Sequence, residues 1–426
     1  MNGVKAAISA ILLSLAGVWS LPVTATEVAP EQEEAASDRR VMVMLKLGAD
    51  HYRAGGDYGG PYGDVMGEKA RLRIARSIAR RYRLTLIEAW PMQLIGVDCV
   101  IMGINDDRSA AAVAEEISKL PGVEWSQPLN EYRMQAGATK QGYNDRLFGA
   151  QAWNLPRLHR MATGRGVTVA IVDSRIDTRH PDFAGKIVIA PDFVVPKRMV
   201  AESHGTGVAG IIAAQPNNAL GIAGVAPDAR VLGLRACWER PLGGATVCDT
   251  LSLAKALTFA LENKADVINL SLTGPQDRLL ETLIGLAIKR NLTIVAAVDK
   301  QRPQSSFPAF VPGVLPVSDE RLPSGMPPVY IAPGRDIPTT GPDGKWTMVS
   351  GSSFAAAHVS GLAALMHQIH SLRFRTASGS TLMGPRGAID ACAALVRVSQ
   401  LDGDCSKSHQ VADLRGLCPA FCQCAQ

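Results

Sequence analysis

Three separate stretches of the chain carry the side chains needed for nucleophilic catalysis by a serine. Asp173 ends the apolar run VAIVD, His204 begins the run HGTGVAG, and Ser353 is the second residue after the glycine in the run SGSSFAAAH. A hydroxyl, an imidazole that accepts its proton and a carboxylate that orients the imidazole are the parts of a Ser-His-Asp hydrolase. Alone, each residue could be a strand-end turn, a helix cap or an N-cap. Together we interpret them as the nucleophile (Ser353), the general base and acid (His204) and the orienting carboxylate (Asp173).

The segments around these residues predict the sheet that would bring them together. Continuous apolar runs, typical of buried strands, alternate with helical runs, and this alternation predicts an α/β fold with a parallel sheet flanked by helices. Functional groups of such folds gather beyond the carboxyl ends of the strands, where Asp173 stands. Ser353 begins an almost wholly apolar helix. The expected strands are 166–174, 228–237, 265–272 and 292–299, and the expected helices are 204–214, 250–264 and 278–290.

The motifs and their order along the chain resemble the subtilisin-like serine proteases (the subtilase family, peptidase family S8), which carry an N-terminal propeptide. VAIVDSRIDTRHPDF resembles the Asp block of that family, SHGTGVAGIIAA the His block and GSSFAAAHVSGLAAL the Ser block. The likeness covers roughly residues 145–396 and implies a peptidase domain over 145–398. It implies that Ser353, rather than Ser352, is the nucleophile, and that His358 has a structural role. The expected activity is endoproteolysis of protein or peptide substrates through an acyl-enzyme.

One departure from the family concerns the oxyanion hole. Where the family has an asparagine that donates a hydrogen bond to the developing negative charge, VAAVDKQ has Asp299. An ionised carboxylate cannot donate, and losing one such donor costs about 10²–10³-fold in rate. A protonated Asp299 could donate. We therefore expect an activity that improves as pH falls, until His204 becomes charged.

The resemblance also identifies the residues that would bind substrate. Thr273 replaces the glycine of an SLG wall, and Val298 replaces the glycine before the oxyanion residue. Both side chains are expected to narrow the primary specificity pocket, which predicts small residues (Ala, Gly, Ser) before the scissile bond. The candidate substrate-binding residues are Ser271, Leu272, Thr273, Gly274 and Val298.

The N-terminus has the pattern of a secretory signal peptide. Lys5 precedes a long apolar run that ends in small residues near Ala25, and an acidic stretch follows over 26–38. An uncleaved membrane anchor is the alternative, although Gly17 and Pro22 weaken it. We expect a signal peptide over 1–25, an acidic linker over 26–38, and a secreted or periplasmic protein without a stable membrane span.

Residues 39–135 predict a small α+β unit. Strands are expected at 41–47, 98–104 and 123–129, and helices at 68–84 and 108–120, an order typical of a split β-α-β (ferredoxin-like) sandwich. By resemblance this unit would be an inhibitory propeptide whose last strand occupies the cleft until the chain is cut near 130–145. Its first helix carries six arginines, which form a solvated face or pair with a partner domain: Arg71, Arg73, Arg76, Arg80, Arg81 and Arg83.

Composition limits the remaining function classes. The formal net charge is only +5 and is spread along the chain, so nucleic-acid binding is not expected. No cofactor is required; calcium is common in the family, but no ligand set can be assigned. In an exported protein the eight cysteines predict disulfides, first of all Cys237–Cys248, which bracket a Gly/Pro turn. The Cys-rich tail, 399–426, could instead bind metal, although its spacing matches no regular zinc pattern.

Two further functions remain open on the sequence alone. Asp299 and the narrowed pocket are compatible with a pseudoprotease that binds peptides without turning them over. They are also compatible with an attenuated protease that only releases its own propeptide and then serves as a binding protein. The intact Asp173, His204 and Ser353 set favours an active endopeptidase.

Overall fold

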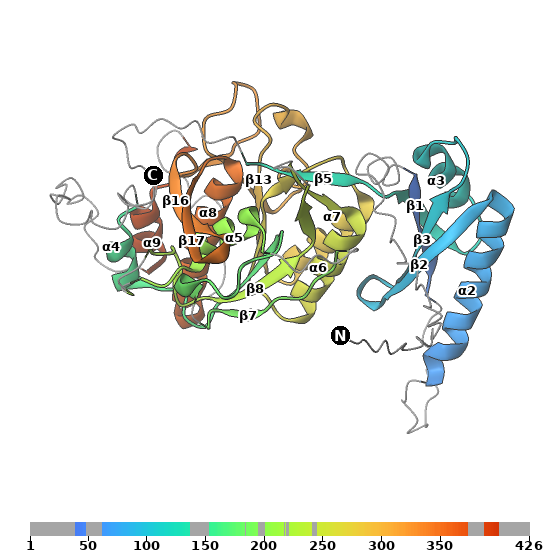
Figure 1. The fold of residues 1–426 in the computed structure, drawn as a ribbon, viewed down its shortest axis with the longest axis horizontal. Helices are drawn as coiled ribbons and strands as arrows, with labels where there is room; N and C mark the ends of the chain where they lie inside the picture. The colour runs from blue at the N-terminus through green and yellow to red at the C-terminus, as the bar shows by residue number, and fades with distance from the viewer. Residues whose placement is uncertain are drawn as a thin grey trace, which may run out of the picture.

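The structure, a computed structural model, describes most of the chain between residues 39 and 399. The described residues are 39–47, 62–136, 153–183, 185–194, 201–216, 218, 221–240, 245–373 and 387–399. They form a small α+β unit and a larger α/β unit, which lie side by side (Figure 1). The expected signal peptide and acidic linker, and tail residues 400–426, lie outside this part of the chain. None of the helices in the described ranges combines the length and apolar character needed to cross a membrane.

The larger unit is built on a seven-stranded sheet in which neighbouring strands are parallel throughout. This confirms the predicted α/β fold class. The four expected strands are β6, β8, β11 and β13, whereas the shorter strands β7, β14 and β15 were not predicted. In spatial order the strands are β15 (Tyr330–Ile331), β14 (Val314–Ser318), β13 (Thr293–Ala297), β11 (Val267–Leu270), β6 (Thr168–Asp173), β8 (Arg230–Arg235) and β7 (Ile187–Ile189).

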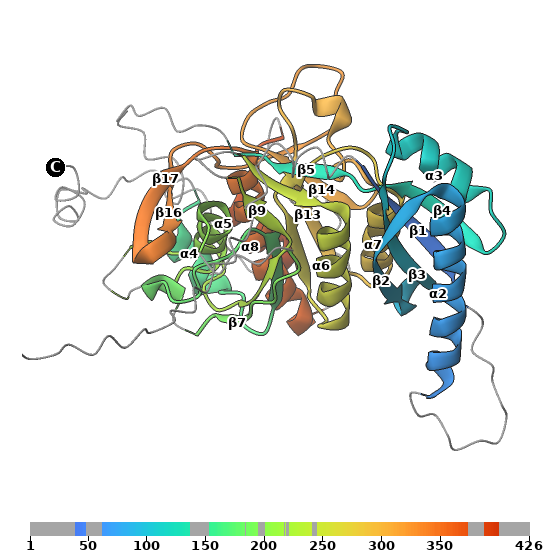
Figure 2. The ribbon, with the colours of Figure 1, turned by 45° about the vertical axis from the view of Figure 1, so that its right-hand side comes forward.

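Helices cover both faces of this sheet, as its continuous apolar strands require. One hydrophobic cluster joins α4 (Leu155–Met161), α5 (Ser203–Ala213), α8 (Ser352–Arg373) and α9 (Ala391–Ser399) to one face. A second cluster joins α6 (Thr250–Glu262) and α7 (Arg278–Lys289) to the other face (Figure 2). A hairpin of β16 (Ile337–Gly341) and β17 (Lys345–Val349) packs against α5.

The small unit has the predicted split β-α-β topology with one strand more than expected. Its order along the chain is β1 (Arg40–Lys46), α2 (Tyr62–Tyr82), β2 (Leu84–Met92), β3 (Val97–Ile104), α3 (Ala110–Ser118) and β4 (Val123–Pro128), and its antiparallel sheet has the order β2-β3-β1-β4. The helix expected to reach residue 84 ends at Tyr82, because Arg83 takes a left-handed φ of 56° and the chain turns into β2.

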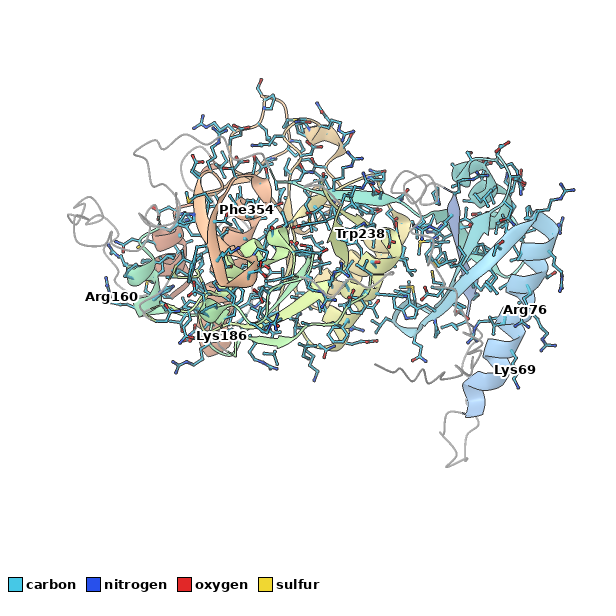
Figure 3. All side chains as sticks on the ribbon, in the orientation of Figure 1. Lys69, Arg76, Arg160, Lys186, Trp238 and Phe354 are labelled. Atoms are coloured by element: carbon cyan, nitrogen blue, oxygen red, sulfur yellow. A yellow bond between two sulfur atoms is a disulfide. The ribbon has the colours of Figure 1, made fainter. Side chains whose placement is uncertain are left out.

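The two faces of the small sheet have different partners. Helices α2 and α3 cover one face. The other face is packed against α6 and α7 of the larger unit. Arg71 is buried and pairs with Asp98 of β3 at 2.8 Å, whereas the other five arginines of the run are exposed. Figure 3 shows Lys69 and Arg76 projecting from α2 away from the larger unit, so this helix presents a solvated basic face.

A further strand, β5 (Glu131–Met134), links the two units. It leaves the small unit directly after β4 and crosses the larger one, as Figure 1 shows. On one side it is antiparallel to β10 (Thr246–Asp249), and on the other to β12 (Leu272–Thr273); β9 (Cys237–Glu239) completes this sheet beyond β10. Cys237 and Cys248 face each other across β9 and β10 and form the predicted disulfide.

Candidate active site

Two of the predicted catalytic residues form a buried hydrogen-bonded pair. Asp173 is the last residue of β6, at the carboxyl end of the sheet, and His204 is the second residue of α5. The His204 Nδ1 lies 2.9 Å and 3.1 Å from the two carboxylate oxygens of Asp173. The Ser174 amide also donates to Asp173, at 2.6 Å. With Nδ1–H directed at the carboxylate, the Nε2 atom is the one able to accept a proton.

Ser353 lies next to this pair, but its hydroxyl is bonded elsewhere. It is the second residue of α8 and is fully buried. The following residue, Phe354, contacts the His204 ring with centroids 5.3 Å apart. The Ser353 hydroxyl donates to the Ser271 carbonyl at 2.8 Å, while His204 Nε2 is buried without a hydrogen-bond partner. Proton transfer to His204 therefore requires the hydroxyl to leave the Ser271 carbonyl.

The N-terminus of α5 carries a cap that the sequence did not indicate. The Glu239 carboxylate accepts hydrogen bonds from the backbone N–H groups of Ser203 (2.6 Å) and His204 (3.0 Å). A carboxylate at this position satisfies free helix donors and offsets the positive end of the helix dipole. Glu239 lies on β9, 35 residues beyond His204, so no local motif could have identified it.

A network of ion pairs, part of it buried, supports the same region. Arg235 pairs with Glu202 at 3.0 Å and with Asp192 at 3.1 Å. Arg175, two residues after Asp173, also pairs with Asp192, and its backbone N–H donates to Glu202 at 2.6 Å. The four charged groups alternate in sign, so the buried charges of Arg235 and Glu202 and the partly buried charges of Arg175 and Asp192 all have opposite partners. These pairs hold the loop after β6 against the start of α5.

The carboxylate of the predicted oxyanion residue, Asp299, is bonded within its own turn. The Asp299 carboxylate accepts from the backbone N–H groups of Gln301 (2.8 Å) and Arg302 (3.2 Å), and the Arg302 guanidinium lies 3.6 Å away. Within the described ranges, the one hydrogen bond to the Gln135 carbonyl comes from the Ser353 backbone N–H, at 3.1 Å.

The predicted substrate-binding residues lie along β5 and the residue that follows it. Ser271 O accepts from the Gln135 backbone N–H at 3.2 Å, and Leu272 and Thr273 pair with β5. Thr273 Oγ1 also accepts from the Gln135 side-chain amide at 2.7 Å. These contacts, and the place of Gln135 beside Ser353, were not predicted.

Two members of the predicted set differ from the others. A Cβ added to Gly274 would lie 2.3 Å from the Tyr132 ring, so this glycine lies against a side chain three residues before Gln135. Val298 is fully buried in the cluster on the α6 and α7 side. Its role in narrowing the primary pocket stays a prediction.

His358, the second histidine of the helix motif, lies in the core. Its Nδ1 is 2.8 Å from the Phe354 carbonyl, and its ring meets Trp153 edge-on with centroids 5.5 Å apart. Burial lowers the pKa of His358 to about 4, against the smaller opposing effect of the Phe354 carbonyl. The ring is therefore neutral over the physiological range and acts in packing rather than in proton transfer.

No metal-binding group was assigned from sequence. Among the residues that the structure describes, no group of three or more His, Cys, Asp or Glu side chains is arranged to hold a metal ion. Four of the tail cysteines (405, 418, 422 and 424) lie outside this part of the chain, and Cys99 is a buried free thiol whose pKa is raised by burial.

Comparison with known proteins connects this geometry to a family. Residues 164–319 match the Subtilase family (Peptidase S8). The chain is 34% identical over 275 residues to the thermophilic serine proteinase of Bacillus sp. (strain AK1), covering 60% of this chain and 66% of that protein. It is 33% identical over 238 residues to thermitase of Thermoactinomyces vulgaris, covering 53% of this chain and 83% of thermitase.

A solved structure shares the fold. Fervidolysin from Fervidobacterium pennivorans, described as related to subtilisin, superposes with a TM-score of 0.61 at 19% identity, covering 84% of this chain and 61% of fervidolysin. At that identity the likeness bears on fold alone, and the sequence matches carry the assignment. This chain belongs to the subtilase family of serine endopeptidases.

Proposed function

We propose that Ser353, His204 and Asp173 are the catalytic residues of this endopeptidase. The single observation that carries the proposal is the Asp173–His204 pair, whose free Nε2 is buried beside the start of α8. Ser353 Oγ attacks the substrate carbonyl carbon and His204 Nε2 takes its proton, while Asp173 stabilises the imidazolium. The C–N bond then breaks, and His204 returns the proton to the leaving amine. Water hydrolyses the acyl-enzyme by the same steps.

The negative charge that develops on the carbonyl oxygen meets an incomplete oxyanion hole. The Ser353 backbone N–H is in position to donate to it, as it does to the Gln135 carbonyl. Asp299, which uses its carboxylate to close its own turn, supplies no second donor. We therefore propose a slow enzyme at neutral pH, limited at the step that forms the tetrahedral intermediate.

We further propose that residues 39–135 are an inhibitory propeptide. Support comes from a buried hydrogen-bond set between the units, centred on the carboxylate of Asp277 at the N-cap of α7. It accepts from Gln127 (2.8 Å) and Asn130 (3.1 Å) of the small unit, and from Thr250 (2.8 Å) of the larger one. Together with β5, which lies along β10 and β12, these contacts would exclude other peptides from the cleft.

We also propose the limits of the catalytic domain and the cellular location of the protein. The catalytic domain would extend over 145–398, with residues 399–426 as an appendage of unassigned role. Export to the periplasm or outside the cell would agree with the signal-like N-terminus and with the Cys237–Cys248 disulfide, since disulfides persist in oxidising compartments. The expected substrates are proteins or peptides.

The proposal is tested by turnover. The full chain, allowed to process itself, should hydrolyse a fluorogenic peptide repeatedly, and a Ser353→Ala chain prepared in parallel should not. The alternative is an attenuated protease that cuts only its own chain. One self-cleavage event without later turnover of added peptides would support that alternative, and turnover by the Ser353→Ala chain would overturn both.

A further inference from the structure

The chain places its own backbone in the position of a substrate, and one residue meets the catalytic serine. Glu131–Met134 (β5) lies between β10 and β12 with antiparallel pairing on both sides. The next residue, Gln135, contacts Ser353 twice. Its carbonyl accepts from the Ser353 backbone N–H at 3.1 Å, and its own N–H lies 3.0 Å from Ser353 Oγ.

The contacts single out one peptide bond. A carbonyl that is polarised by the N–H group of the nucleophile belongs to the bond that the nucleophile attacks. The carbonyl held in this way is that of Gln135, so the bond concerned joins Gln135 to Ala136. The preceding residues of β5 are instead paired with β10 and β12.

The Gln135 side chain has a polar partner that a small residue could not use. Its Nε2 donates to Thr273 Oγ1 at 2.7 Å and to the Arg133 carbonyl at 3.3 Å. A glutamate at this position would present only acceptors, and a methionine of similar length would present no donor. Methionine would leave the buried Thr273 hydroxyl without this hydrogen bond, which is how a polar site rejects an isostere. Glutamate could only accept a hydrogen bond from that hydroxyl.

We propose that this enzyme cleaves its own chain between Gln135 and Ala136 and that Thr273 makes it selective for glutamine before the scissile bond. The inference rests on the proposed function, and it replaces the preference for small residues that the sequence alone suggested. In this proposal Thr273 recognises the glutamine side chain of the substrate, whereas the sequence suggested only that it narrows the primary specificity pocket.

A second contact defines what precedes the glutamine. Tyr132, three residues before Gln135, is fully buried and lies against Gly274, where an added Cβ would fall 2.3 Å from the ring. Its hydroxyl donates to the Pro275 carbonyl at 3.3 Å, and burial raises the pKa of the phenol, which stays protonated and able to donate. Arg133, between these positions, is exposed. The favoured substrate is therefore a peptide of the form Tyr-x-x-Gln.

The bond changes balance without any co-reactant except water. The Ser353 Oγ–H bond breaks and an ester forms between Oγ and the Gln135 carbonyl carbon. The proton passes through His204 to the Ala136 nitrogen as the C–N bond breaks, leaving a free amine. Water then cleaves the ester, which restores the Ser353 hydroxyl and leaves Gln135 as the carboxyl end of the released fragment.

The first test identifies the two chain ends that the cleavage produces. The full chain is expressed, and the released fragment and the remaining chain are analysed by intact mass and by N-terminal sequencing, with the Ser353→Ala chain as the uncut control. We expect a fragment that ends at Gln135 and a chain that begins at Ala136. Ser353-dependent cleavage at another bond would overturn this inference and leave the proposed function standing. Absence of any Ser353-dependent cleavage or turnover would overturn the proposed function with it.

The second test measures selectivity with the processed enzyme. Hexapeptides Tyr-Arg-Met-Gln-Ala-Gly are compared with versions in which the glutamine is replaced by methionine or glutamate. One hydrogen bond between uncharged groups predicts a kcat/KM about 3- to 10-fold higher for glutamine than for methionine. Equal values, or a preference for alanine at this position, would contradict the proposal.

Variants of Thr273 distinguish the effect of its hydroxyl group from the effect of its side-chain volume. In Thr273→Val the hydroxyl is lost at similar volume, and we expect the ratio of kcat/KM for glutamine over methionine to fall toward one. Thr273→Ser keeps the hydroxyl and should keep the ratio. A ratio unchanged in Thr273→Val would overturn the role of Thr273. Because the peptide series uses the unmodified enzyme, the proposal stays testable even if a variant fails to fold.

Discussion

The two halves of the proposed catalytic cleft differ in the hydrogen bonds that they offer to the reaction. On the proton-transfer side, Asp173 and His204 are buried, closely bonded and supported by the Glu239 cap. On the oxyanion side, Asp299 satisfies its own turn, and the Ser353 N–H alone donates to the carbonyl in the cleft, among the residues described.

In the proposed mechanism, this difference would place the loss of rate on the oxyanion side and not on the proton-transfer side. A missing donor lowers the rate for every substrate, but a segment of the same chain is delivered to the nucleophile at high effective concentration. Self-cleavage at β5 can therefore remain efficient while cleavage of free peptides is slow.

The largest effect is expected on the proton-transfer side. Asp173→Asn keeps the shape of the side chain but offers an amide to His204, which favours the wrong imidazole tautomer. The rate of self-processing should fall by about 10⁴-fold. The half-time for release of the N-terminal fragment, followed by gel electrophoresis, measures this. A loss below about tenfold would mean that the buried pair does not serve catalysis.

The pH dependence of folding stability tests whether His358 is buried as a neutral ring. His358 has a pKa of about 4 in the folded chain against an ordinary value of 6.5, so the folded state binds fewer protons between these pH values. Its contribution to stability is complete above about pH 6.5 and is lost as pH falls toward 4, by roughly 3 kcal/mol.

This prediction is checked by denaturant unfolding in a Ser353→Ala background, which prevents self-digestion. Changing His358→Gln should remove that part of the pH dependence, leaving a shallower loss of stability between pH 6.5 and 4. Identical slopes with and without His358 would show that the ring does not titrate in this way.

On the oxyanion side, substitution should raise activity. Asp299→Asn retains an oxygen for the Gln301 and Arg302 amides and adds an N–H₂ group that can donate to the developing charge. We expect kcat for added peptides to rise by about 10- to 100-fold at neutral pH. Asp299→Ala, which adds no donor, is the matched control. No increase in Asp299→Asn would show that Asp299 is not what limits the rate.

The smallest effect concerns the helix cap. Glu239→Ala removes the acceptor for the Ser203 and His204 amides, which should cost about 1 kcal/mol of stability and a few-fold in kcat through looser placement of His204. Glu239→Gln keeps one acceptor oxygen and should lose less in both measurements. If both substitutions left the free energy of unfolding and kcat unchanged, the cap would have no part in positioning His204.

The sequence was most informative where local pattern decides structure. Asp173 at a strand end and Ser353 at the start of an apolar helix follow from periodicity, and the Cys237–Cys248 disulfide follows from a short turn. Other features depend on residues distant in sequence. The Glu239 cap, the contact of Gln135 with Ser353 and the position of Thr273 opposite a glutamine arise only when the chain is folded.

Labelling of the processed protein with a fluorophosphonate tests most directly whether Ser353 is an activated nucleophile. We expect one modified peptide, with the probe on Ser353, and no labelling of the same preparation after heat denaturation. A processed, folded protein that stays unlabelled across pH 5–8, or that is labelled on another serine, would contradict it.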